Sequence, residues 1–167
     1  GITRLTGSGL SMVDWRPIAG ILPPITDNQW NEVFQMYQAS PEYQKVNRGM
    51  SLSDFKFIFF WEYLHRILGR IVGLLCLVPY LYFLIRGKLS PRMKVFGLTL
   101  IGLVVGQGLM GWYMVKSGLV NNPEVSHYRL AAHLSLAFSV FGLAWWMILS
   151  LGRGETSARN MEARWVR

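Results

Sequence analysis

Three apolar runs, 57–85, 95–115 and 130–151, constrain this chain more than any other feature. Each matches or exceeds the ~20 residues that a helix needs to cross a bilayer. Because backbone polar groups in lipid must hydrogen-bond within their own segment, such runs cross as helices. The sequence, which is 51% hydrophobic, therefore predicts an all-α, polytopic membrane helix bundle with three transmembrane helices.

The net charge of +8 is unevenly placed along the chain. Residues 1–56 carry equal numbers of acidic and basic groups, whereas 86–94 has four basic groups and no acidic one, and 152–167 is net positive. Basic loops that flank membrane spans mark the cytoplasmic or matrix side, so the charge indicates topology and not nucleic-acid binding. We therefore expect 1–56 and 116–129 outside, and 86–94 and the linker 152–167 inside.

The external loop 1–56 is expected to contain short amphipathic helices. Four apolar residues follow helical i, i+3, i+4, i+7 spacing: Trp30, Val33, Phe34 and Tyr37. Asp27 is a candidate N-cap for this helix, which lies either against the membrane or on the rest of the loop. Ser51 and Asp54 have the spacing of a capping box that starts the first span.

The first span contains four ionisable residues: Glu62, His65, Arg66 and Arg70. A charged side chain at mid-membrane costs ~2.5 kcal/mol or more, so such groups are kept where they have partners or a function. Gly69 lies one turn beyond His65 and leaves a smooth strip beside the imidazole. A flat ligand or a second helix can lie close at such a strip.

Two histidines, His65 and His133, have matching depths in the first and third spans. The intervals from them to Arg86 and Arg153, which mark the inner boundary, are both ~30 Å on a helix. These two spans run in the same direction, so the imidazoles can face each other as axial haem ligands. The alternative is that each is a hydrogen-bonding residue near the membrane interface. His127 falls on another face and is not expected to be a ligand.

Two arginines accompany these histidines. Arg66 follows His65, and Arg129 lies one turn outward of His133. The guanidinium group suits the carboxylates of haem propionates. The alternative is that Arg66 pairs with Glu62 at i, i+4 and that Arg129 only extends to the interface.

Several motifs in order along the chain resemble those of the haem A synthase family. They are Thr3-Arg4-Leu5-Thr6-Gly7-Ser8-Gly9-Leu10-Ser11, Trp15-Arg16-Pro17, Gly20-Ile21-Leu22-Pro23-Pro24, Glu62-Tyr63-Leu64-His65-Arg66, Gly111-Trp112-Tyr113-Met114-Val115-Lys116-Ser117-Gly118-Leu119 and Tyr128-Arg129-Leu130-Ala131-Ala132-His133-Leu134. The resemblance is to the branch of Gram-negative bacteria and mitochondria, since the first external loop has no cysteine pair.

The resemblance implies an eight-helix enzyme of two similar four-helix halves, which oxidises a methyl group of haem O to the formyl group of haem A for cytochrome oxidase. This chain then corresponds to the first half without its first helix and is expected to be inactive alone. His65 and His133 match the histidine pair that holds the substrate haem. Glu62 matches the family's glutamate near the reacting methyl, and haem b is expected in the other half.

The resemblance also implies candidates for the haem propionates and for partners. The propionate candidates are Arg4, Arg16, Arg66 and Arg129. The expected partners are the haem O substrate, haem O synthase, oxidase assembly factors, the lipid bilayer and a second copy of the protein. The expected location is the inner membrane of a bacterium or a mitochondrion.

Two other functions remain open from the residues alone. A bis-histidine membrane electron carrier needs the same histidines but gains little from Glu62 one turn from a ligand. A membrane scaffold would use its polar residues only to hold helices together, and it would be colourless when purified.

Overall fold

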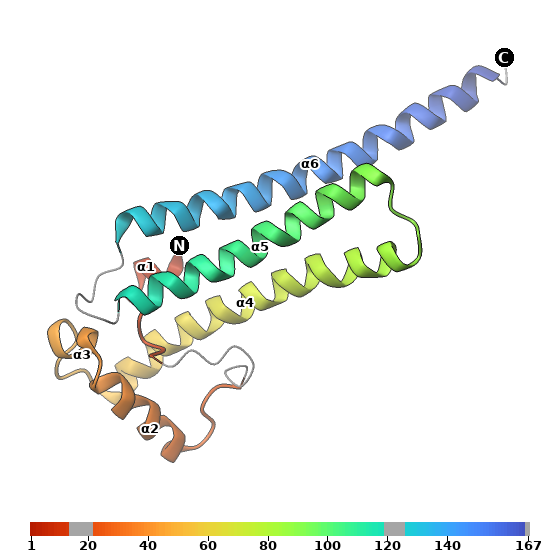
Figure 1. Cartoon of the computed structure of the whole chain (residues 1–167). Coiled ribbons are helices and arrows are strands. Elements are labelled where there is room, and N and C mark those ends of the chain that lie inside the picture. The colour runs from red at the N-terminus through yellow and green to blue at the C-terminus, as the bar shows by residue number, and fades with distance from the viewer. Residues whose placement is uncertain (14–21, 119–125, 166–167) are drawn as a thin grey trace. The chain divides into compact units, whose positions relative to one another are not determined.

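The computed structural model describes residues 1–13, 22–118 and 126–165, with side chains described as far as Gly152. Within these ranges the chain is helical and has no strand, which confirms the all-α prediction. The helices are α1 (Ile2–Leu5), α2 (Asp27–Gln38), α3 (Pro41–Lys45), α4 (Leu52–Ile85), α5 (Pro91–Gly118) and α6 (His127–Trp165) (Figure 1).

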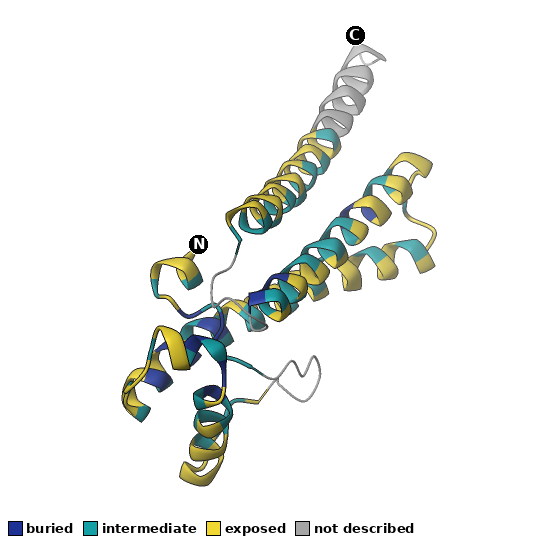
Figure 2. Ribbon diagram, turned by 60° about the vertical axis from the view of Figure 1, so that its left-hand side comes forward, coloured by how far each residue is buried: buried dark blue, intermediate teal, exposed yellow. Residues whose placement is uncertain are grey.

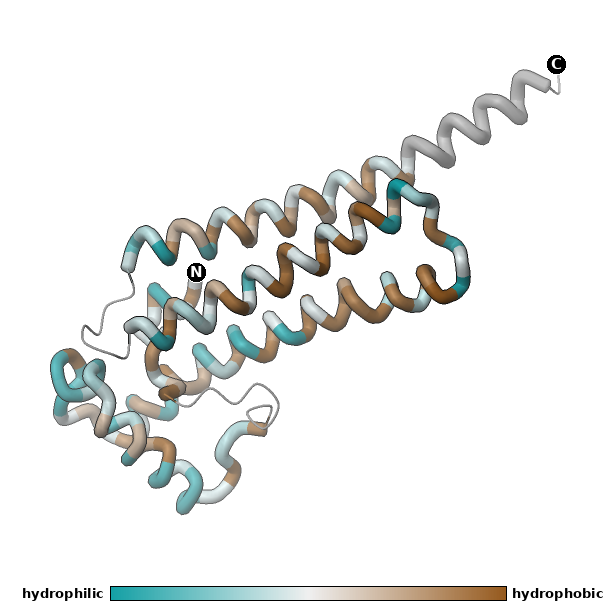
Figure 3. The backbone as a smooth tube through the Cα atoms, in the orientation of Figure 1, coloured by the Kyte–Doolittle hydropathy of each residue, from teal (hydrophilic) through white to brown (hydrophobic). Residues whose placement is uncertain are grey.

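Helices α4, α5 and α6 are the three predicted spans. Each contains a segment long and apolar enough to cross a membrane, and in α6 that segment is His127–Gly152. Hydrophobic residues dominate these helices, whereas α2 and α3 are mainly hydrophilic (Figure 3). Helices α5 and α6 extend past the predicted apolar limits at both ends, and α4 does so at its start, because capping and backbone hydrogen bonds, not hydropathy, decide where a helix begins and ends.

Short polar side chains cap the starts of α2 and α4. At α4, Ser51 Oγ accepts from Asp54 N–H at 3.2 Å and donates to Asp54 Oδ2 at 2.6 Å, which confirms the predicted start. The prediction of Asp27 as the N-cap residue of α2 is wrong by one residue. Thr26 is the N-cap and forms a capping box with Gln29, while Asp27 lies in the first turn, where an acid suits the helix dipole.

The chain divides into two compact units. Unit 1 comprises Gly1–Val72 and Gly108–Ala132, and unit 2 comprises Gly73–Gln107 and His133–Arg167. Each long helix contributes to both units. Of the candidate residues that the structure describes, His133 belongs to unit 2 and the others belong to unit 1.

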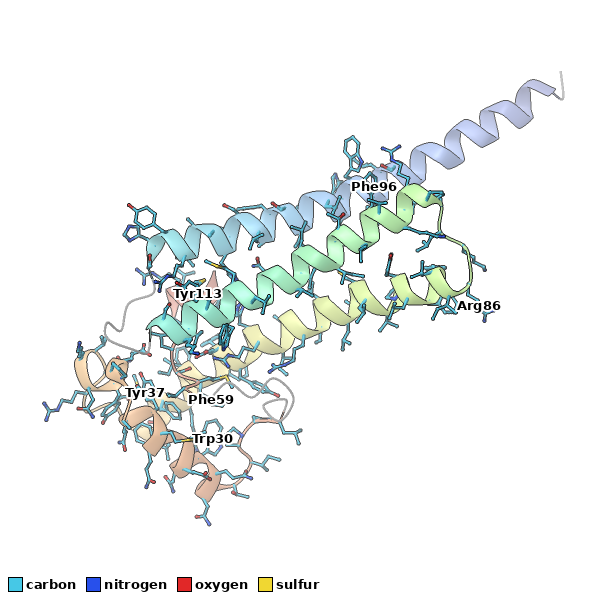
Figure 4. The ribbon with its side chains drawn as sticks, viewed as in Figure 1. Trp30, Tyr37, Phe59, Arg86, Phe96 and Tyr113 are labelled. Atoms are coloured by element: carbon cyan, nitrogen blue, oxygen red, sulfur yellow. The ribbon has the colours of Figure 1, made fainter. Side chains whose placement is uncertain are left out.

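Unit 1 has an aromatic core under α2 and α3. Tyr37 of α2 stacks on Phe55 of α4 with ring centroids 4.9 Å apart, and Trp30 meets Phe59 edge-on at 5.1 Å. Trp30, Tyr37 and Phe59 lie together in Figure 4, and buried residues gather at this end of α4 in Figure 2. The predicted amphipathic helix therefore packs its apolar face on the protein itself. We call α2 and α3 the cap.

In unit 2, α4 and α5 meet at a tyrosine and a glycine. Tyr80 lies against Gly97, where a Cβ atom would overlap the phenol ring. The Tyr80 hydroxyl donates to the backbone carbonyl of Lys94 at 3.1 Å. Glycine thus permits a close approach of these two helix segments, as is common in membrane helix pairs. Pro79 lies inside α4, which continues past it.

Candidate functional site

The site is built around Glu62, which is only 2% exposed although it lies in a membrane helix. The Ser11 hydroxyl donates to Glu62 Oε2 at 2.7 Å, and the Met12 backbone N–H donates to the same oxygen at 2.8 Å. Both donors come from residues 1–13, which we call the N-terminal segment. A buried carboxylate that accepts such hydrogen bonds avoids most of the cost of burial.

Arg66 occupies the other carboxylate oxygen. Its Nε–H donates to Glu62 Oε1 at 3.1 Å, its Nη2 group also donates there, and Nη2 reaches the Met12 carbonyl at 3.2 Å. The structure therefore shows the i, i+4 pair that the sequence left as the alternative to a propionate contact. The pair joins α4 to the N-terminal segment, and both oxygens of Glu62 accept hydrogen bonds.

The N-terminal segment is itself folded so that Ser11 faces α4. Gly7 has a φ of +62°, a left-handed conformation that favours glycine, and the Ser11 N–H donates to the Ser8 carbonyl at 3.2 Å. Leu10 is 3% exposed and packs on Gly118 at the end of α5. The segment thus contacts two membrane helices of unit 1.

His65 and Glu62 face different surroundings despite their spacing. Three residues on a helix leave two side chains ~60° apart, and here Glu62 is buried while His65 is exposed. A Cβ atom at Gly69, one turn beyond His65, would meet no described atom within 4 Å. An accessible imidazole beside open space fits axial ligation of a planar group such as haem.

The other candidate residues have the following positions. His133 is half-buried on α6 in unit 2. His127 is exposed and lies against the Tyr128 ring. Arg4 is exposed, and Arg129 lies over the Tyr113 ring, 4.8 Å from its centroid. Arg16 falls outside the described residues.

The described residues contain no group of three or more His, Cys, Asp or Glu side chains that could hold a metal ion. Haem has a weaker requirement, because the porphyrin supplies the equatorial ligands and the protein adds only axial ones. A histidine pair is therefore a sufficient donor set for haem.

Sequence reasoning missed Ser11, Met12 and Glu42. Glu42, the second residue of α3, is 6% exposed, and burial raises the pKa of its carboxyl to about 8, with a further increase from Glu62. The sequence Ser40-Pro41-Glu42 is typical of a helix start and gives no sign of burial. Burial likewise raises the pKa of the Tyr37 phenol to about 12.

Comparison with known proteins gives a consistent result. The family model described as "Cytochrome oxidase assembly protein" (COX15-CtaA) matches residues 1–167. A protein named heme A synthase from Nitrosospira multiformis is 53% identical over 92% of this chain and 44% of its own length. Another of that name from Paramagnetospirillum magneticum is 50% identical over 96% of this chain and 45% of its own length.

A heme A synthase–mitochondrial ferredoxin fusion protein from Schizosaccharomyces pombe is 50% identical over 87% of this chain and 25% of its own length. The chain thus spans less than half the length of these curated relatives. No solved structure matches it. With a family model that covers all its residues and relatives at about half identity, the chain belongs to the cytochrome oxidase assembly protein family COX15-CtaA.

Proposed function

We propose that this chain forms the substrate-binding part of a haem A synthase, an oxidoreductase that converts a methyl group of haem O to the formyl group of haem A. The observation that carries the proposal is Glu62, a buried and fully hydrogen-bonded carboxylate one turn from the exposed His65. The names of the relatives support the same activity. A pure electron carrier has little use for such a group.

In this proposal His65 and His133 are the axial ligands of the substrate haem, which supplies the iron and the reacting methyl group. Glu62 is the first acceptor for a proton released there. Its hydrogen bonds from Ser11, Met12 and Arg66 fix the carboxylate in position, and one of these donors moves away when the carboxylate takes up the proton.

We propose fewer arginines as partners of the haem propionates than the sequence suggested. Because Arg66 donates to Glu62 and to the Met12 carbonyl, we assign it to the carboxylate and not to haem. Arg129 and the exposed Arg4 remain candidates among the described residues, and Arg16 remains one from the sequence.

We infer that haem b belongs to the part of the relatives that this chain does not cover. The fusion of one relative to a ferredoxin supports an iron–sulfur protein as an electron-transfer partner. Haem O synthase, oxidase assembly factors and a second copy of the protein are further proposed partners. The three spans place the protein in the inner membrane as a multi-pass protein.

The test is pigment analysis of the full-length protein after purification. We expect haem O and haem A together with haem b, since an enzyme retains substrate and product whereas a carrier retains one permanent cofactor. Haem b alone, in cells that also make haem O, would contradict the proposed activity.

A further inference from the structure

The hairpin between α4 and α5, in unit 2, carries a group of basic residues that the proposed function does not use. We call these four exposed residues the basic cluster: Arg86, Lys88, Arg92 and Lys94. The sequence has no acidic residue between Glu62 and Glu124. The segment that forms the cluster therefore supplies no counter-charge of its own, and an anion from outside the chain can supply it.

The backbone of this hairpin has a defined conformation. At the end of α4 the Lys88 N–H donates to the Phe83 carbonyl at 3.0 Å, and Gly87 has a φ of +64°, as in a glycine helix stop. At the start of α5 the Ser90 Oγ accepts from the Met93 N–H at 3.3 Å. The contact of the two helices through a tyrosine and a glycine holds the ends of the hairpin together. The basic side chains thus extend from a fixed backbone.

Two arginines of the cluster are held against aromatic rings. The Arg86 guanidinium lies over the Tyr82 ring, 5.5 Å from its centroid, and the Arg92 guanidinium lies over the Phe96 ring at 5.2 Å (Figure 4). A guanidinium that stacks through its face keeps the N–H donors along its edge, and these donors match the geometry of phosphate oxygens. The stacking therefore places two phosphate-binding groups where the membrane spans begin and end.

Exposed apolar side chains lie beside the basic ones along the chain. Ile85 immediately precedes Arg86, Val95 immediately follows Lys94, and Leu98 lies about one turn further along α5; all three apolar residues are exposed. A ligand that covers both kinds of surface needs an anionic head and apolar chains. Free phosphate or a nucleic acid would leave the apolar side chains uncovered, whereas a phospholipid covers both.

We propose that the basic cluster binds the phosphate headgroup of an anionic phospholipid, whose acyl chains lie along the exposed apolar residues beside it. Arg86 and Arg92 donate hydrogen bonds to the phosphate oxygens, and the two lysines add positive charge. The alternative is that these residues only orient the spans during membrane insertion. That role requires charge in the hairpin but no selectivity for lipid afterwards, so the purified protein distinguishes the two.

The experiment measures lipid binding to the full-length, haem-loaded protein by native mass spectrometry. The probes are dioleoylphosphatidylglycerol, which is anionic, and dioleoylphosphatidylcholine, which has the same chains and no net charge. Each basic group near an anionic lipid contributes a factor of ~5 to binding, so Lys88→Gln/Arg92→Gln should bind phosphatidylglycerol ~30-fold more weakly than the wild type. Its phosphatidylcholine binding should be unchanged. Lys88→Arg/Arg92→Lys, which keeps both charges, should retain most of the phosphatidylglycerol binding.

The matched control is Lys45→Gln/Arg48→Gln, which removes the same two charges from exposed positions in unit 1 and should bind both lipids as the wild type does. Equal affinity of the wild type for the two lipids would overturn the proposal, whether or not any variant folds. Wild-type binding of phosphatidylglycerol by Lys88→Gln/Arg92→Gln, or an equal loss in the control, would also overturn it.

A soluble headgroup separates a lipid site from a site for free phosphate. Glycerol 3-phosphate carries a phosphate but no acyl chains, so at equal concentration it should not displace phosphatidylglycerol from the wild type. Displacement would show that the cluster binds phosphate alone and would overturn the lipid assignment. Higher salt should weaken phosphatidylglycerol binding, because the basic residues are exposed. Binding that is independent of salt would contradict recognition by these charges.

Discussion

The two units differ in what covers their apolar side chains. In unit 1, Tyr37 and Phe55 are fully buried by helices of the same unit. In unit 2, Phe138 and Phe141 are each 67% exposed, and Leu100 is the one buried hydrophobic residue that the structure describes there. Unit 1 therefore makes its own core from the cap, whereas the apolar surface of unit 2 needs lipid or further protein. The polar network around Glu62 lies in the unit that has the core.

Truncation of a large aromatic side chain should show the largest difference in stability loss between the two units. Phe55→Ala removes a fully buried ring and should lower the stability of unit 1 by ~3–5 kcal/mol. Phe141→Ala, the matched change at an exposed ring, should have little effect. Thermal unfolding of the purified protein in detergent measures the stability of both variants. Equal stability losses would contradict the claim that only unit 1 buries its aromatic rings.

Breaking the Glu62–Arg66 ion pair should lower stability about as much as truncating a core ring. Arg66→Ala leaves the buried Glu62 without its counter-charge and should cost ~3–5 kcal/mol, with loss of bound haem. The double variant Glu62→Gln/Arg66→Gln removes both charges and should recover much of this stability. Arg86→Ala is the control, since Arg86 is exposed and lies over the Tyr82 ring. A stable Arg66→Ala protein with normal haem content would argue against the network.

The pH dependence of stability should come from the cap of unit 1. The pKa of Glu42 rises from 4.5 to about 8 on folding, so its contribution is complete below pH 4.5 and is lost as the pH rises through 8. Between pH 6 and pH 8 this loss should be about 2 kcal/mol. Glu42→Gln should flatten that part of the curve, as melting temperatures across this range would show. A curve with the wild-type slope in Glu42→Gln would remove Glu42 as its source.

Smaller effects are expected where the N-terminal segment contacts α5. A Cβ atom at Gly118 would lie 3.0 and 3.2 Å from the two Cδ atoms of Leu10, so Gly118→Ala should displace Leu10 and cost ~1 kcal/mol. Gly102→Ala, where a Cβ atom meets nothing within 4 Å, is the control and should be neutral or slightly stabilising. Faster proteolysis within residues 1–13 of Gly118→Ala alone would support the contact.

The sequence predicted the three membrane helices because long apolar runs have few alternatives in lipid. It predicted the Glu62–Arg66 pair only as an alternative, since i, i+4 spacing permits that contact without requiring it. The hydrogen bond from Ser11 to Glu62 joins residues 51 positions apart, and no local pattern indicates it. The burial of Glu42 likewise depends on how α3 packs over α4. The polar sequence of α3 does not predict that packing.

The central claim is that Glu62 is held in place by the N-terminal segment and, as we propose, takes part in methyl oxidation. Glu62→Gln/Arg66→Gln in the full-length protein tests it most directly, because this variant loses the carboxylate without leaving a buried charge. Protein level, bound haem and the ratio of haem O to haem A should be measured in one preparation. We predict near-normal protein, haem O bound at the site, and haem A formation reduced ~10²–10⁴-fold. Haem A formation at the wild-type rate would contradict the claim.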